Sequence, residues 1–324
     1  MPRKTSVLLS MSLASVLTLS TVGTAGAAAV DSTSCQSVNS VSVKTKTATS
    51  TAPQTQQQKA QKQLTQNKQL VLNMFKTIFT EHKLDQASRY IATDYIQHNP
   101  LAANGRQAFV DFFQPFVKQN PDYNVEVKRI IAQGDLVLVH SLAKTTKSDR
   151  GMAVVDIFRV KNNKVVEHWD VGQSVPEKSA NDNTMFPLAG TPVQVKATST
   201  KQVAANVKLV TTFYNDFFNK RDIHALTKYV AEDYIQHNPT VPTGRKPLES
   251  FIPILKQNPD NQAKIVRVIA EGDIVALHVH STANKQDRGS AVIDIFRVAN
   301  GKIVEHWDVV QQVPEQSANN NTMF

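Results

Sequence analysis

The sequence contains one long segment twice. Residues 156–170, Asp-Ile-Phe-Arg-Val-Lys-Asn-Asn-Lys-Val-Val-Glu-His-Trp-Asp, return almost unchanged as residues 294–308. Further matches precede this segment, because Tyr-Ile-Gln-His-Asn-Pro occurs at both 95–100 and 234–239. The repeat runs through helix-like, turn-like and strand-like stretches alike. We therefore predict two copies of one domain, each of about 120 residues.

Each copy is predicted to be helical first and β-rich afterwards. Apolar residues recur at helical spacing from Leu64 to Phe79. A short helix fits residues 84–91, and a third helix fits residues 107–119. Four long strands with hairpin-type turns follow, at 124–133, 136–145, 152–160 and 165–175. Helices followed by an antiparallel sheet predict an α+β fold for each copy.

The domain boundaries follow from the repeat and from shifts in composition. Domain 1 is expected at residues 64–186 and domain 2 at residues 203–324, because both copies end with Asn-Thr-Met-Phe. Residues 187–202 contain two Pro and one Gly and are predicted to be a linker. Residues 30–63 are rich in Ser, Thr, Gln and Lys, with almost no large apolar side chains. Such a segment cannot bury enough surface to offset its ordering entropy, so we predict a disordered tail.

The first 29 residues have the features of a secretory signal peptide. Arg3 and Lys4 precede an apolar run at 7–19 and an Ala-rich stretch at 24–29. The alternative is an uncleaved membrane anchor, but the run is short for a span and rich in Ser and Thr. We therefore expect residues 1–29 to be removed and the mature protein to be secreted or associated with the cell envelope. Cys35 is the single cysteine, which excludes an intrachain disulfide and leaves a free thiol in the tail.

The net charge of +9 does not indicate a nucleic-acid-binding face. Residues 31–80 carry six Lys and one Asp, whereas residues 81–324 carry 28 basic and 26 acidic residues. Nucleic-acid recognition uses basic residues clustered on one folded face, and here the excess lies in the predicted tail. The tail suits loose attraction to an anionic envelope polymer, or it only improves solubility. We expect no nucleic-acid partner and no membrane span in the mature protein.

A His and an Asp lie two residues apart near the end of each copy. Alternation along a strand places His168 and Asp170 on one face of the sheet and Trp169 on the other. His306 and Asp308 repeat the arrangement. Asp is disfavoured in the middle of a strand, which asks for a reason. A carboxyl in an apolar pocket has a raised pKa that suits proton transfer, and a neighbouring His can orient it or share its proton. A structural pair bonded to the backbone is the alternative.

The repeated motifs resemble the SnoaL-like family of the nuclear-transport-factor-two-like superfamily. The resemblance rests on Tyr-Ile-Gln-His-Asn-Pro, Gly-Arg, Asp-Ile-Phe-Arg-Val, Val-Glu-His-Trp-Asp and the final Asn-Thr-Met-Phe, and it covers residues 65–186 and 204–324. It implies two cone-shaped α+β domains, in which a curved sheet wraps helices around an apolar pocket. Polyketide cyclases of the family close rings by an aldol reaction without a cofactor, using a pocket carboxylate as acid/base. By resemblance, that carboxylate is Asp170 in the first copy and Asp308 in the second.

Asp156 and Asp294 are further candidates whose face the sequence leaves open. A two-residue hairpin turn pairs Lys161 with Lys164 and sets Asp156 opposite Trp169, on the face away from His168. A β-bulge would reverse this. Related isomerases with a similar Asp-x-Phe-Arg stretch use that Asp inside the pocket, so the resemblance implies a pocket role.

The remaining candidates are histidines, which we expect to contact a pocket ligand. They are His98 and His237 in the His-Asn-Pro motif, and His140, His278 and His280 in the second long strand and its repeat. His-Asn-Pro is equally suited to a tight turn, and the strand histidines equally suit a solvent-facing side. No spacing matches a compact zinc site, and no nucleotide-binding glycine loop or CxxC pair occurs, so neither metal nor cofactor is predicted.

These observations predict an exported protein with a small-molecule pocket in each repeat. The predicted chemistry is cofactor-free acid/base catalysis by an Asp-His pair, as in aldol-type condensation, isomerisation or hydration. The alternative is a non-catalytic exported binding module for an apolar small molecule, and a third possibility is a structural pair of domains. Whether the chain is an enzyme is left open by the sequence.

The two copies are expected to pair with each other. Cone domains of the family commonly pair through the outer faces of their sheets, and Trp169 and Trp307 would mark that face here. A linker of about sixteen residues makes the encounter intramolecular. We therefore predict a pseudo-two-fold dimer within one monomeric chain.

Overall fold

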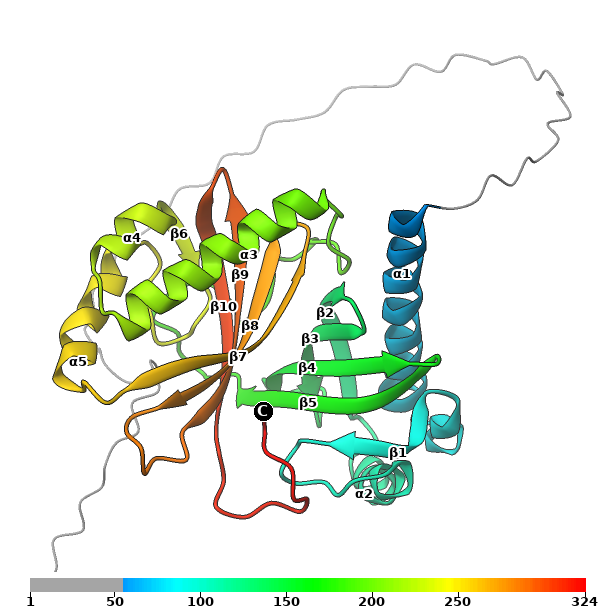
Figure 1. Cartoon of the computed structure of the whole chain (residues 1–324). Coiled ribbons are helices and arrows are strands. Elements are labelled where there is room, and N and C mark those ends of the chain that lie inside the picture. The colour runs from blue at the N-terminus through cyan, green and yellow to red at the C-terminus, as the bar shows by residue number, and fades with distance from the viewer. Residues whose placement is uncertain (1–54) are drawn as a thin grey trace, which may run out of the picture.

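A computed structural model describes residues 55–324, so the predicted signal peptide, Cys35 and most of the predicted tail lie outside the described residues. Two α+β domains follow one another, each with a five-stranded sheet and a layer of helices (Figure 1). The predicted α+β class is confirmed for both copies. Within residues 55–324, no helix combines the length and apolar character needed to span a bilayer.

Domain 1 begins with helix α1 (Gln56–Met74), which continues as a π-helical turn, η1 (Phe75–Thr80). A 3-10 helix and a further α-helix complete the helical layer, namely η2 (Leu84–Arg89) and α2 (Arg106–Gln119). The strands are β1 (Ile91–Gln97), β2 (Asn124–Gln133), β3 (Leu136–Lys144), β4 (Met152–Lys161) and β5 (Lys164–Ser174). The sheet order is β1-β5-β4-β3-β2, in which β1 runs parallel to β5 and all other neighbours are antiparallel.

Domain 2 repeats this order with small changes in its helices. Its helical elements are α3 (Thr200–Tyr214), η3 (Asn215–Asn219), α4 (His224–Tyr229), η4 (Lys246–Ser250) and α5 (Phe251–Gln257). Its strands are β6 (Val230–Gln236), β7 (Gln262–Glu271), β8 (Ile274–Thr282), β9 (Ser290–Ala299) and β10 (Lys302–Gln312). The sheet order, β6-β10-β9-β8-β7, is the same as in domain 1.

Two predicted boundaries are wrong. Helix α1 begins at Gln56 rather than near residue 64, because Thr55 and Gln58 form a capping box that satisfies the first free N–H groups. The predicted disordered tail therefore does not extend to residue 63. Strand β1 begins at Ile91, where a helix was predicted to end, and runs to Gln97 through a stretch in which no strand was predicted. Its partner β5 lies far away in the sequence, and a parallel pairing of this kind leaves no hairpin signal.

A bulge sets the register of the hairpin that carries the candidate carboxylates. Val160 pairs with Val165, and Arg159 pairs with Glu167, so Val166 is an extra residue in β5. As a result Asp156 lies directly opposite Asp170. The bulge-free register, which set Asp156 opposite Trp169, is wrong. Domain 2 has the same shift, and Asp294 pairs with Asp308.

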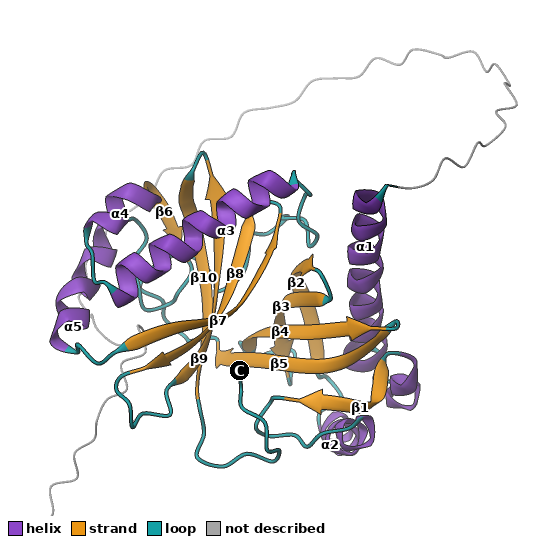
Figure 2. Ribbon diagram, viewed as in Figure 1, coloured by secondary structure: helices purple, strands orange, loops and turns teal. Residues whose placement is uncertain are grey.

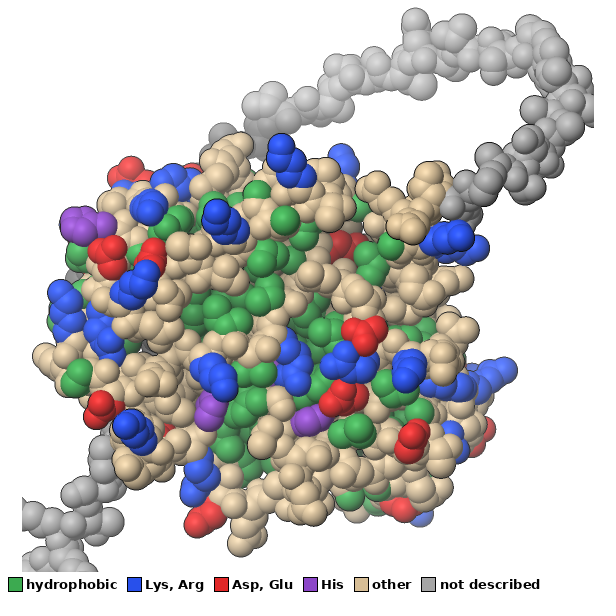
Figure 3. Space-filling model, viewed as in Figure 1, with side chains coloured by type: hydrophobic (Ala, Val, Ile, Leu, Met, Phe, Trp, Pro, Cys, Tyr) green, Lys and Arg blue, Asp and Glu red, His purple; other side chains and the backbone are tan. Residues whose placement is uncertain are grey.

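The two sheets pack against each other through their outer faces, as predicted. Their shared core contains both tryptophans, each 1% exposed, with aliphatic residues of β3, β4, β8 and β9 around them. The helices lie on the far side of each sheet (Figure 2). Arg267 stacks on Trp169 at 3.7 Å, and Arg129 stacks on Trp307 at 3.8 Å, so each domain covers the aromatic ring of the other with a cation. Hydrophobic side chains also gather where the domains meet on the viewed face, with charged groups around them (Figure 3).

Polar contacts fix how the domains are joined. Lys68 of α1 forms a buried ion pair of 2.5 Å with Glu271 of β7, whose other oxygen accepts the backbone N–H of Ala132. The predicted linker lies along the edge of β2, where the backbone N–H of Ile130 donates to Val193. The segments that end each copy cross to the other domain. We call residues 177–186 the inner tail and residues 315–324 the C-terminal tail, which approaches β1 and α2 in Figure 1.

Candidate functional site

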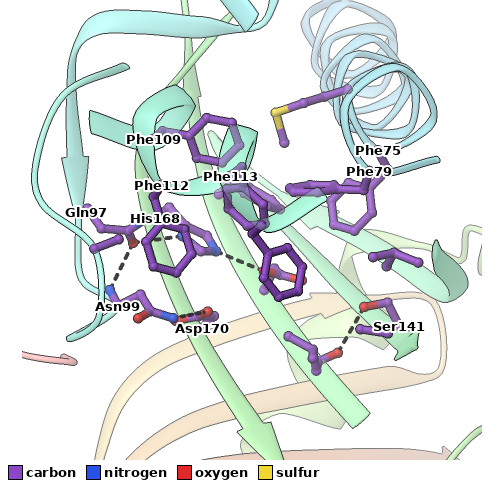
Figure 4. A pocket seen from close by; sticks show the side chains of 18 of the residues that line it. Phe75, Phe79, Gln97, Asn99, Phe109, Phe112, Phe113, Ser141, His168 and Asp170 are labelled. Carbon is purple, nitrogen blue, oxygen red and sulfur yellow. Dashed lines mark hydrogen bonds and ion pairs between the residues drawn. The ribbon is translucent and has the colours of Figure 1, made fainter. Parts of the chain in front are cut away.

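Domain 1 encloses a cavity of about 350 Å³ between its helices and its sheet. Aromatic rings form much of the wall: Phe75 and Phe79 from η1, Phe109, Phe112, Phe113 and Phe116 from α2, and Tyr95, Tyr123 and Phe158 from the sheet side (Figure 4). The rings pack mostly edge to face, as with Phe79 against Phe113 at 5.3 Å between centroids. The cavity therefore suits an apolar molecule with a flat, aromatic-sized body.

Three ionisable groups stand together in the wall of this cavity. Asp156, His168 and Asp170 all line it, and their ligand atoms lie within 4.8 Å of one another. They come from adjacent strands, β4 and β5, and face the helices because alternation and the bulge point them the same way. The predicted His168–Asp170 face is confirmed, with Trp169 on the opposite face in the core between the domains. Asp156 also lies on the cavity side.

The imidazole of His168 is held by two acceptors. Its Nε2 lies 2.9 Å from Asp156 Oδ1, and its Nδ1 lies 2.9 Å from Gln97 Oε1. The backbone N–H of Asn99 donates to the same side-chain atom of Gln97, which identifies that atom as the amide oxygen and not the amide nitrogen. Nδ1 of His168 must therefore carry a proton and donate to it. Burial alone lowers the pKa of His168, but the Asp156 hydrogen bond and the charges of both carboxylates outweigh it and raise the pKa. The ring is thus prepared to carry a proton next to the cavity.

The two carboxylates differ in their surroundings. Burial raises the pKa of Asp156, and the bond to His168 only partly offsets this. Asp170 Oδ2 accepts a hydrogen bond of 2.7 Å from the side-chain amide of Asn99. Asp170 Oδ1 is buried and accepts no hydrogen bond from the described residues. An unsatisfied carboxylate oxygen beside a cavity is costly unless a ligand or a proton fills its place.

Domain 2 carries the same trio in a more closed setting. His306 lies between Asp294 at 2.9 Å and Gln236 at 3.0 Å, and Asn238 donates to Asp308 at 2.7 Å. Asp294 and Asp308 are 4% and 6% exposed, whereas Asp156 and Asp170 are only half-buried. Burial raises the pKa of Asp308 to about 6, and the charge of Asp294 adds to this shift.

A tyrosine hydroxyl occupies the site of domain 2. The hydroxyl of Tyr214 donates to Asp294 Oδ2 at 2.9 Å. The repeat aligns this tyrosine with Phe75, which brings no hydroxyl to Asp156. The helix segment that covers the site is also less aromatic, because residues 246–257 contain Phe251 as their only aromatic residue.

The mouths of the two sites differ in polarity. Three residues that line the cavity of domain 1 are exposed and apolar, namely Leu101 at 67%, Phe112 at 42% and Met152 at 42%. The repeat places Thr240 and Ser290 where domain 1 has Leu101 and Met152. Domain 1 therefore presents an apolar rim that domain 2 lacks at these positions.

His98 and His237 were predicted to contact a pocket ligand, and this prediction is wrong. Alternation along the motif turns Gln97 and Asn99 toward the cavity and His98 to the face between the domains. There His98 stacks on Trp169 at 4.8 Å, contacts Glu167 at 3.0 Å, and reaches the backbone oxygen of Thr322. His237 has the same contacts, with Trp307, Glu305 and Thr184. These histidines join the domains.

The predicted pocket role of His140, His278 and His280 is likewise corrected. In β3 the residues that line the cavity are Ser141 and Ala143, so His140 points to the face between the domains. There its ring packs at a tilt against Phe186, with ring centroids 5.3 Å apart. His278 packs at a tilt against Phe324, and His280 stacks on the same ring. Burial lowers the pKa of His140 well below its usual range, and that of His278 to about 3, so both are neutral core residues.

Two site residues were missed from the sequence. Gln97 sets the tautomer of His168, and Asn99 holds Asp170, yet neither side chain titrates, so neither stood out as chemistry. The available signal was their place in the repeated Tyr-Ile-Gln-His-Asn-Pro motif, in which the sequence singled out only the histidine.

The trio could also offer ligands to a divalent cation. A metal at this place would take His168 Nε2 and one oxygen of each carboxylate. It would first have to displace the hydrogen bond between His168 and Asp156, and Gln97 Oε1 would still fix Nδ1 as a donor. The same holds for His306, Asp294 and Asp308.

Comparisons with known protein families match each copy to a SnoaL-like family. The family described as "SnoaL-like polyketide cyclase" matches residues 208–316, and the family described as "SnoaL-like domain" matches residues 71–168. Among solved structures, wild-type IdmH from Streptomyces antibioticus shares 22% identity over 33% of this chain and 91% of its own, with a TM-score of 0.28. TsrD from Streptomyces laurentii shares 19% identity over 33% and 89%, with a TM-score of 0.28. An NTF2-like protein of unknown function from Mesorhizobium loti shares 19% over 36% and 99%, with a TM-score of 0.31. A search of curated proteins found no match.

Proposed function

We propose that this chain, which consists of two SnoaL-like domains in tandem, binds an apolar carbonyl compound in the cavity of domain 1 and moves a proton on it without a cofactor. One observation supports this most. The buried Oδ1 of Asp170 accepts no hydrogen bond from residues 55–324, and it belongs to a trio that shares one wall of an aromatic cavity. Buried polar groups are almost always satisfied, so the missing partner is expected to come from the ligand.

The proposed reaction gives each of the three side chains a different role in proton transfer. Asp170 takes a proton from a carbon next to a carbonyl group, and the C–H electron pair moves onto the carbonyl oxygen as an enolate. His168, whose pKa is raised by Asp156 and Asp170, gives a proton to that oxygen. The enolate then reacts in one of two ways. Its carbon attacks a second carbonyl group, as in an aldol condensation, or a different carbon of the same molecule is protonated, as in an isomerisation. Asp170 then gives its proton to the new alkoxide oxygen in the condensation, or to the carbon in the isomerisation. The first oxygen returns its proton to His168 as its carbonyl group re-forms, so both side chains are restored.

Asp308 Oδ1 is likewise buried and accepts no hydrogen bond from residues 55–324, so the choice between the domains rests on other features, and these favour domain 1. In domain 2 the hydroxyl of Tyr214 donates to Asp294. Domain 1 has Phe75 at the equivalent position, and a phenylalanine offers no hydroxyl to Asp156. The domain 1 rim of Leu101, Phe112 and Met152 can also hold an apolar part of the ligand outside the cavity. We propose that the trio of domain 2 has become a structural network.

We also propose that the protein acts outside the cytoplasm, because residues 1–29 have the composition of a signal peptide. Mass spectrometry of the protein from culture medium or cell envelope should find an N-terminus near residue 30. Recovery of the intact N-terminus only from the cytosol would contradict export.

The proton-transfer proposal can be tested with α-tetralone, a ketone fused to an aromatic ring. In deuterated buffer, the full chain should accelerate exchange of the protons next to its carbonyl group, as followed by NMR. Asp170→Asn should reduce this rate by about 100-fold or more, since general acid/base groups contribute 10²–10⁴-fold. The melting temperature should stay within a few degrees.

The chain offers a matched control in Asp308→Asn. This variant makes the same change in domain 2 and should retain the exchange activity. Loss of exchange in Asp308→Asn alone would move the chemistry to domain 2. Binding of the ketone without exchange in the wild type would show a binding module rather than an enzyme.

A further inference from the structure

The loop that holds the Asp170 carboxylate is itself held by the other domain. Asn99 uses every polar group it has. Its backbone N–H donates to Gln97, its side-chain oxygen accepts the N–H of Leu101, and its amide donates to Asp170. Its backbone oxygen accepts a hydrogen bond of 2.7 Å from Asn319, in the C-terminal tail of domain 2. The orientation of Asn99 is therefore set partly by domain 2.

Further bonds from the C-terminal tail secure the same loop. Asn319 also donates to the backbone oxygen of Ala102 at 2.8 Å. Asn321 donates to the backbone oxygen of Gln97 and to the side chain of Asn104, both at 2.8 Å. Both ends of the Gln97–Asn104 loop are thus bonded to the C-terminal tail.

The inner tail makes the same contacts on domain 2. Asn181 donates to the backbone oxygens of Asn238 and Val241, both at 2.7 Å, and Asn183 donates to that of Gln236 at 2.9 Å. Asn238 in turn holds Asp308. The exchange of tails is therefore reciprocal, and each trio depends on a residue of the opposite copy.

We infer that the C-terminal tail is a positioning element for the site of domain 1, and that Asn319 acts on Asp170 through the backbone of Asn99. This inference deepens the proposed function, on which its catalytic consequence rests. The site of domain 1 is incomplete without domain 2, because a severed domain 1 lacks the donors that fix Gln97 and Asn99. It also gives a reason for the tandem arrangement even where only one cavity is used.

The test uses two isosteric substitutions in the full chain. Asn319→Asp keeps the size of the side chain and the oxygen that accepts the N–H of Asn321, but removes the donors to Asn99 and Ala102. Asn181→Asp makes the matched change on the inner tail, where Asn181 also accepts the N–H of Asn183. The first variant should disturb only domain 1, and the second only domain 2.

The primary readout needs no substrate. In ¹H–¹⁵N spectra, the side-chain amide of Asn99 should exchange with solvent at least about tenfold faster in Asn319→Asp. The loop loses the bonds that Asn319 donates to the backbone oxygens of Asn99 and Ala102, so the bond from the Asn99 amide to Asp170 opens more often. The exchange rate of the Asn238 side-chain amide should be unchanged in this variant. Asn181→Asp should give the reverse pattern. The inference would be overturned if neither variant changed the exchange rate of either amide, or if each variant changed the exchange rates of both amides equally. If Asn319→Asp does not fold, Asn321→Ala removes the neighbouring bonds and serves in its place.

The second readout is the α-tetralone exchange rate. Asn319→Asp should lower kcat by about 10- to 100-fold with little change in KM, as expected when a reacting group is misplaced but the cavity is kept. Asn181→Asp should keep the wild-type rate. A wild type without exchange activity would defeat the proposed function, yet the amide readout would still decide on the positioning role. Equal loss of kcat in both variants would show only a general structural effect.

Discussion

Asp308→Asn should change how the stability of the chain depends on pH. Asp308 is 6% exposed, and burial first, then the charge of Asp294, raises the pKa of its carboxyl from 3.8 to about 6, against the charge of His306 and the Asn238 hydrogen bond. At 1.36 kcal/mol per pKa unit, this shift corresponds to about 3 kcal/mol. Removing the carboxylate should remove that cost.

The sign follows from proton uptake. Between pH 4 and 6 the folded protein keeps its proton on Asp308, whereas the unfolded chain has released it. The wild type is therefore penalised increasingly as the pH rises through this window, and fully above about pH 6. Relative to the wild type, Asp308→Asn should gain up to about 3 kcal/mol between pH 4 and pH 7. In this variant an amide N–H₂ group can take the place of Asp308 Oδ1, which has no hydrogen-bond partner among residues 55–324. The cost of leaving that group unpaired does not vary with pH and does not alter the slope.

Urea unfolding followed by tryptophan fluorescence is the suitable assay. Both tryptophans lie in the core between the domains, so the signal reports on the joined structure. Asp216→Asn is a control of opposite sign, because the ion pair with Lys220 lowers the pKa of Asp216. That variant should lose a little stability at neutral pH and none in acid. A stability difference between Asp308→Asn and the wild type that is flat or falls from pH 4 to 7 would refute the reasoning.

Three further predictions concern packing and assembly. Lys68→Met should lower the free energy of unfolding in urea by about 3–5 kcal/mol, because it leaves Glu271 buried without its partner. The double variant Lys68→Met/Glu271→Gln should recover much of this loss. No recovery would mean that packing of the lysine stem dominates. Tyr214→Phe should cost about 1–3 kcal/mol in the same assay through loss of the bond to Asp294, and an unchanged midpoint would show that the hydroxyl is not needed there. The full chain should be a monomer by light scattering, whereas domain 1 alone should dimerise or aggregate because it exposes Trp169 and its neighbours; a monomeric isolated domain would contradict a shared core.

Much of the fold could be predicted because its signals are local or repeated. Alternation along β5 correctly separated His168 and Asp170 from Trp169. The position of Asp156 could not be settled, because it depends on one inserted residue, Val166, and valine is an ordinary strand residue. A hairpin turn fixes the register only as far as the first irregularity.

The wrong histidine assignments share a different cause. The sequence offered two sides for His140, one facing a pocket and one facing solvent. The second face of the sheet is instead covered by the other domain, a possibility that strand alternation alone does not reveal. The tail exchange was hidden for a related reason. Asn181 and Asn319 stand in equivalent places of the repeat, and identical sequences would result whether each tail bound its own domain or the other.

The central claim is that domain 1 holds one ligand in its aromatic cavity, and native mass spectrometry with α-tetralone tests it most directly. Ala143 lines the cavity, and the repeat aligns it with Ser281 of domain 2. The wild type and Ser281→Phe should each bind one equivalent, whereas Ala143→Phe should lose this binding, because the added ring takes up space that the ligand needs. Binding that survives in Ala143→Phe, or that is lost in Ser281→Phe, would contradict a ligand site in domain 1.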